Sequence, residues 1–121
     1  MINTNYEGET LEVRSFYSKR GFTVNLGNFF PASVKKMYQL VEMITDYEDD
    51  CDRRSDHVLK MIHWLEDQIQ ELENQVRDSM DRGMVNVKKA NKISKLAGKY
   101  KRNIERLKAA AKKYHIDIEE V

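Results

Sequence analysis

The chain has 121 residues, of which 40% are hydrophobic and 34% charged, and a formal net charge of +1. This length fits a single domain over 1–121, and the one cysteine excludes an internal disulfide. Because no apolar run spans a bilayer and the first residues lack a signal-peptide pattern, we expect a cytoplasmic protein without a membrane segment.

Residues 10–30 are predicted to form a β-hairpin. Apolar and polar residues alternate in TLEVRSFY and in FTVNL, as expected for strands with one buried face. The SKRG segment between them is expected to be the turn, with Gly21 able to adopt a positive φ. Lys19 and Arg20 would then lie at the hairpin tip, as recognition residues or as a solvated turn. Since an isolated hairpin is marginally stable, it must pack on another element.

A first helix is predicted over 32–46, with Pro31 in its first turn. The acidic segment that follows, 46–56, is either a solvated part of one long helix or a break between two. We favour a break, with Ser55 or Asp56 as the N-cap of the next helix.

Two further helices are predicted from apolar residues that recur at alternating spacings of four and three, which is a heptad pattern. They are an acidic helix over 56–82 and a basic helix over 86–114, separated near Gly83. A short connection favours an antiparallel pair. Apolar residues on a second face near Trp64 predict that the β-hairpin and first helix pack there, while the end near Gly83 projects.

These elements predict an α+β fold that is mainly α. An N-terminal β-hairpin packs on an antiparallel helical (coiled-coil) hairpin, with two to three helices in all.

Charge is divided unevenly along the chain. Residues 34–82 carry seven basic and thirteen acidic side chains, whereas residues 83–121 carry eleven basic and four acidic. With the apolar seam of the basic helix at heptad positions a and d, most of its cations fall at c and f, which face away from the partner helix. The resulting outer set, a candidate partner- or phosphate-binding surface, is Lys88, Lys92, Lys95, Lys99, Arg102, Arg106 and Lys113.

The acidic segment is a second candidate, because clustered carboxylates can mimic phosphates and dock in a basic groove. Its members are Asp46, Glu48, Asp49, Asp50 and Asp52. The spacing also resembles the start of a calcium loop, but Cys51 and His57 occupy the positions that require Gly and Glu. A solvated acidic turn is the plainer interpretation.

Nothing in the sequence predicts catalysis or a cofactor. Cys51 lacks the partner pattern of a nucleophile, and no glycine-rich phosphate loop is present. His63 and Asp67 form an i, i+4 pair without further ligands at suitable spacing, so no metal site is predicted.

We therefore expect a non-enzymatic interaction protein, monomeric or homodimeric. The leading hypothesis is a module that binds and modulates, or inhibits, a larger protein that handles nucleic acid. A phage- or mobile-element-encoded anti-defence protein, such as an anti-CRISPR, is of this type. The alternative is direct, sequence-nonspecific nucleic-acid binding through the outer cations. A third is self-assembly through exposed seam residues.

Overall fold

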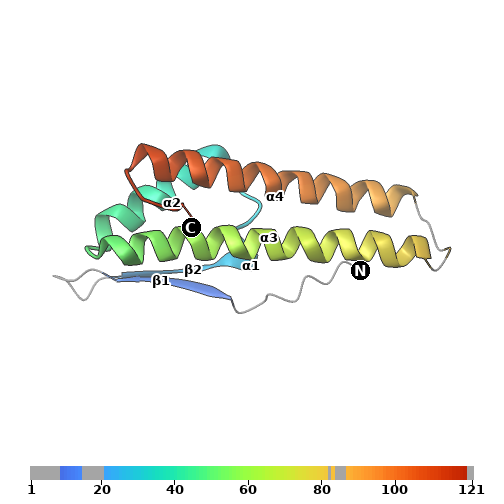
Figure 1. Ribbon diagram of the computed structural model, residues 1–121, viewed down its shortest axis with the longest axis horizontal. Coiled ribbons are helices and arrows are strands. Elements are labelled where there is room, and N and C mark those ends of the chain that lie inside the picture. The colour runs from blue at the N-terminus through green and yellow to red at the C-terminus, as the bar shows by residue number, and fades with distance from the viewer. Residues whose placement is uncertain (1–8, 15–20, 82, 84–86, 120–121) are drawn as a thin grey trace.

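The computed structural model describes residues 9–14, 21–81, 83 and 87–119. In this part of the chain a two-stranded antiparallel sheet precedes four helices (Figure 1). The sheet packs on the helices and the long helices pack against each other, which confirms the predicted fold class. The strands are β1 (Thr10–Arg14) and β2 (Gly21–Asn25), and the helices are α1 (Leu26–Phe29), α2 (Val34–Tyr47), α3 (Cys51–Asp81) and α4 (Val87–Lys113).

The sheet buries one face because its apolar side chains pair across the strands. Leu11 lies opposite Val24 and Val13 opposite Phe22, and both β1 members of these pairs are buried. The sheet lies on the side of α3 opposite to α4 in Figure 1, and β1 contacts both α3 and α2. An ion pair between Lys60 and Glu9 (3.8 Å) and a hydrogen bond from Lys60 to the Thr10 carbonyl oxygen (2.8 Å) join the start of β1 to α3.

Gly21 does not occupy the turn that the sequence suggested. It pairs with Arg14 at the start of β2, and a Cβ at this position would clash with the carbonyl oxygen of Val13. Close approach of two backbones, rather than a positive φ, is what requires glycine here. The connection between the strands, with Lys19 and Arg20, lies outside the described residues.

The sequence predicted Pro31 in the first turn of α2, but it lies before the helix. The peptide bond from Phe30 to Pro31 is cis, and the helix begins at Val34 with Ser33 as its N-cap. The Ser33 hydroxyl oxygen accepts a hydrogen bond from the Lys36 amide (3.4 Å), which satisfies a backbone donor of the first turn.

The chain breaks between α2 and α3, but earlier than predicted. Helix α3 begins at Cys51, and the Asp50 carboxylate accepts hydrogen bonds from the amides of Asp52 (2.9 Å) and Arg53 (3.3 Å). Asp50 is therefore the N-cap in place of the predicted Ser55 or Asp56. A carboxylate accepts from the free amides and complements the helix dipole. Asp56 could do the same, but a helix that begins at Cys51 places Arg54 and His57 in its first two turns, where they contact Thr45 and Glu48.

Helices α3 and α4 run antiparallel along the length of the molecule (Figure 1). Most predicted seam residues are buried, including Leu65, Leu72, Ile93 and Leu107. Near the sheet, Trp64 stacks on Phe30 with ring centroids 5.6 Å apart and meets Tyr100 edge-on at 6.1 Å. This aromatic contact joins the α1–α2 connection to both long helices.

Two parts of the molecule follow from this arrangement. We call "body" the sheet, α1, α2 and the halves of α3 and α4 that they contact. We call "arm" residues 67–81 of α3 and 87–102 of α4, the halves of the two helices that lead to the free end of the pair (Figure 1). Asp67 lies at the boundary, because it also lines a hollow beside the start of β1.

Replacement of Asp50 by Ala removes the N-cap of α3. We expect a loss of about 1 kcal/mol in the free energy of unfolding, measured by chemical denaturation. The matched control is Asp49→Ala, which deletes an exposed neighbouring carboxylate and is expected to change stability by less than about 0.5 kcal/mol. Equal losses for the two variants would contradict the capping role.

Gly98 and Gly21 predict opposite responses to alanine. A Cβ at Gly98, within α4, meets only the flexible end of Arg102 at 3.8 Å. Gly98→Ala is therefore expected to stabilise the protein by about 0.5–1 kcal/mol through helix propensity. Gly21→Ala is expected to destabilise it by about 1 kcal/mol or more, because the backbone of β1 must move. Thermal unfolding of both variants beside the wild type tests the signs.

Candidate functional site

Five cations follow one another along the outer surface of the arm. They stand at successive spacings of four, three, four and three residues in α4, and all five are exposed. Within the described residues none of them has an ion-pair partner. At a rise of 1.5 Å per residue they span about 21 Å. We call this set the basic stripe; it consists of Lys88, Lys92, Lys95, Lys99 and Arg102.

The other two residues of the predicted outer set do not lie on this open surface. Arg106 is half-buried, and its guanidinium donates to the Ala32 carbonyl oxygen (3.5 Å) and to Asn103 Oδ1 (3.4 Å). The Lys113 ammonium lies over the rings of Tyr38 (5.3 Å) and Tyr114 (5.5 Å). The heptad pattern describes two helices only, whereas α2 also packs beside α4. Arg106 contacts the segment just before α2, and Lys113 contacts Tyr38 of α2.

The members of the acidic segment differ in their surroundings. Glu48 is buried at 5% exposure, with its carboxylate 3.2 Å from His57 Nε2. Asp50 caps α3, so only Asp46, Asp49 and Asp52 are exposed without such a role. Glu48 is thus corrected from a docking residue to a structural one.

Glu48 belongs to a polar contact that holds α2 against the start of α3. The Arg54 guanidinium donates to the carbonyl oxygens of Thr45 (2.8 Å) and Glu48, which are among the last, unpaired carbonyls of α2. His57, one helical turn further along α3, meets the Glu48 carboxylate. Glu48, Arg54 and His57 all lie in the mixed acidic and basic segment of the sequence, but their order there does not indicate which of them become buried.

A row of carboxylates on α3 was not predicted from the sequence. These residues repeat the spacing of the basic stripe: Asp67, Glu71, Asn74, Asp78 and Asp81, of which Asn74 alone is uncharged. We call these five residues the acidic stripe. The signal was present in the heptad assignment, since all five fall at positions c and f of α3, the same positions that carry the basic stripe on α4.

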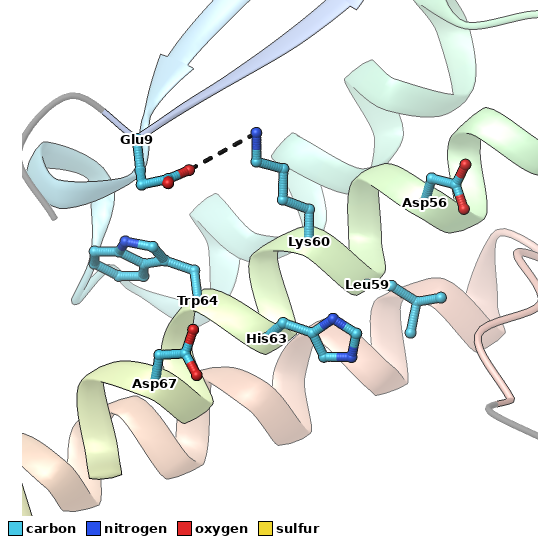
Figure 2. A pocket seen from close by; sticks show the side chains of 7 residues that line it. All are labelled: Glu9, Asp56, Leu59, Lys60, His63, Trp64 and Asp67. Atoms are coloured by element: carbon cyan, nitrogen blue, oxygen red, sulfur yellow. Dashed lines mark ion pairs between the residues drawn. The ribbon is translucent and has the colours of Figure 1, made fainter. Parts of the chain in front are cut away.

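A hollow of about 380 Å³ lies where β1 meets α3. Figure 2 shows the side chains that line it: Glu9, Asp56, Leu59, Lys60, His63, Trp64 and Asp67. His63 and Asp67 both line it, but no group of three or more potential metal ligands is found among the described residues. The Lys60–Glu9 ion pair crosses this region and contributes to the attachment of the sheet.

Comparison with known proteins provides no relative: no family model, no curated protein and no solved structure matches the chain. Within the described part of the chain, no helix combines the length and apolar content needed to cross a membrane.

Replacement of Glu48 by Ala tests its structural role. We expect a loss of about 1–3 kcal/mol in unfolding free energy, because a buried acceptor of His57 is removed. Asp46→Ala, an exposed carboxylate two residues earlier, is the control and is expected to change stability by less than about 0.5 kcal/mol. An effect of Glu48→Ala no larger than that of the control would show that the buried contact contributes nothing.

Proposed function

We propose that this protein is a non-enzymatic nucleic-acid-binding protein that contacts the phosphate backbone through the basic stripe, without reading base sequence. The observation that carries the proposal is the exposure of five cations along about 21 Å of one helix, with no ion-pair partner among the described residues. Exposed cations without an ion-pair partner among the described residues are available to a polyanion.

The composition of the basic stripe favours backbone contact over base contact. Four of its five members are lysine, whose ammonium binds phosphate as a point charge. The aromatic residues of α4 do not lie among them: Tyr100 is a buried seam residue and Tyr114 follows the helix beside α2. Stacking on unpaired bases is therefore not available on the stripe, which favours a duplex over a single strand.

The acidic stripe supports the same proposal by restricting where a polyanion can approach. Helix α3 presents its carboxylates on the opposite outer surface of the arm, where a phosphate backbone is repelled. A nucleic acid would thus meet the arm from the α4 side only.

A protein partner is the second candidate, as in the hypothesis of a module that modulates or inhibits a nucleic-acid-handling protein. The observation that favours it is on α2, where Val34, Met43 and Tyr47 are 41%, 40% and 36% exposed. Apolar side chains left on a helix surface are typical of protein contacts. Only Met43 and Tyr47, one helical turn apart, share a flank of α2, whereas Val34 lies at its other flank, so the exposed apolar surface on either flank is small.

The two candidates separate in a salt titration. Labelled duplex DNA, duplex RNA and a single strand are titrated at 50–200 mM salt. For five phosphate contacts on duplex DNA we expect log K to fall with log salt at a slope of about −4 to −5. The K92Q/K95Q/K99Q/R102Q variant should reduce the slope to about −1 and weaken binding at least tenfold at 50 mM.

A matched control removes the same number of charges elsewhere. K35Q/K36Q/K108Q/K112Q changes the net charge equally but leaves the basic stripe intact. If the two variants lose equal DNA affinity, binding depends on net charge alone, which would contradict a site at the basic stripe. An absence of wild-type binding even at 50 mM would reject the nucleic-acid proposal and favour the protein partner.

A further inference from the structure

The two stripes of the arm match in length and spacing. The acidic stripe begins at Asp67 and ends at Asp81, and the basic stripe begins at Lys88 and ends at Arg102. Each covers fourteen residue steps, about 21 Å of helix, in the same order of four, three, four and three. Neither stripe has an ion-pair partner among the described residues.

The stripes cannot neutralise each other within one chain. Positions c and f face away from the partner helix, so the stripes lie on opposite outer edges of the arm. With a helix diameter of about 10 Å, two helix widths separate them. This distance exceeds the screening length of about 8 Å at physiological ionic strength. The Glu73–Lys101 ion pair (3.3 Å), between residues that flank the seam, shows where contact between the two helices does occur.

We propose that the acidic stripe of a second copy of this chain occupies the basic stripe, with two arms side by side. The inference uses the same basic stripe as the proposed function, so a second copy and a nucleic acid would compete for it. It rests, however, on the acidic stripe, which the proposed function does not need.

The spacing selects one orientation of the two copies. If α4 of one copy lies parallel to α3 of the other, the two sequences of spacings coincide step by step. Asn74, the uncharged member, then faces Lys95, and four oppositely charged pairs remain. Counting from α4 of the first copy to α3 of the second, these pairs are Lys88 with Asp67, Lys92 with Glu71, Lys99 with Asp78 and Arg102 with Asp81.

The shape of the molecule permits the same orientation. Helix α4 runs from the free end of the arm towards the body, whereas α3 runs from the body outward (Figure 1). Parallel α4 and α3 therefore place the two bodies at opposite ends of the pair. With both bodies at the same end, the sheet that covers α3 in one copy would be driven against the body of the other.

This contact is not two-fold symmetric, because a basic stripe meets an acidic one. Each pair of copies leaves one stripe of each sign unoccupied, so association can continue beyond two copies. All of these charges except the half-buried Glu71 are exposed. Contacts between exposed charges are weak and sensitive to salt. We therefore expect association that increases with protein concentration at low salt and disappears as salt is raised.

Charge reversal on either stripe gives a sharp test by sedimentation velocity and light scattering. The variants are K92E/K95E/K99E, which makes both edges acidic, and D67K/E71K/D78K, which makes both edges basic. At 20 mM salt we expect the wild type to associate reversibly, each variant alone to remain monomeric, and an equimolar mixture of the variants to associate again. At 200 mM salt all four samples should be monomeric.

Recovery in the mixture also shows that both variants are folded, and far-UV circular dichroism provides an independent check. Wild-type protein that stays monomeric at 1 mM and 20 mM salt would overturn the proposal, as would folded variants whose mixture stays monomeric. Variants that associate alone as strongly as the wild type would overturn it too.

The outcome is separable from that of the proposed function. D67K/E71K/D78K keeps the basic stripe, so it should bind duplex DNA at least as tightly as the wild type while losing self-association. If the wild type does not bind DNA, the proposed function is rejected. The self-association of the wild type and of the mixed variants is measured without DNA, so that result is unaffected.

Discussion

The apolar seam between α3 and α4 is the interaction on which the rest of the structure depends. Leu65, Leu72, Ile93 and Leu107 are buried along it, at the spacing that keeps two helices in continuous contact. Burial of about 25 cal/mol per Å² makes this seam the main source of stability for helices that carry so much charge. Because the seam determines the rotation of each helix, it also decides which side chains face outward and separates the two signs of charge.

Contacts other than the seam are concentrated in the body. There α2, the sheet and the aromatic cluster around Trp64 cover further faces of the long helices, and the polar contact of Glu48, Arg54 and His57 closes the α2–α3 connection. Among the described residues of the arm, the two helices meet at the seam and at the Glu73–Lys101 ion pair, and Ile69, Val76 and Leu96 are only partly buried. Local opening costs least where few groups are buried, so the free end of the arm is expected to open before the body does.

Periodicity alone predicted much of this fold. The heptad spacings identified both long helices and their antiparallel pairing, and the additional apolar residues near Trp64 identified where the sheet packs. Local competition between caps could not be resolved in the same way: Asp50, Ser55 and Asp56 are all good N-caps, and the choice depended on where Arg54 and His57 could reach α2. Gly21 was assigned to a turn for a different reason: the close approach of two backbones has no signature in the sequence.

The candidate site was predicted in part. Position in the heptad predicted the exposure of five of the outer cations, but the contacts of Arg106 and Lys113 depend on α2 and the segment before it, which a pattern for two helices does not include. The acidic stripe was visible in the sequence and went unused, because the acidic residues of 46–56 are denser. Density in sequence is a poor guide when a turn disperses the residues, whereas regular spacing on a helix keeps them on one surface.

The position of Trp64 gives the two parts of this molecule separate spectroscopic signals. It is the only tryptophan in the chain, and it lies where the α1–α2 connection, α3 and α4 meet. Its fluorescence therefore reports the packing of the body, whereas far-UV circular dichroism is dominated by the long helices and includes the arm. Unfolding curves that coincide by the two methods would describe one cooperative unit, and a helical signal that decays first would describe an arm that melts from its free end.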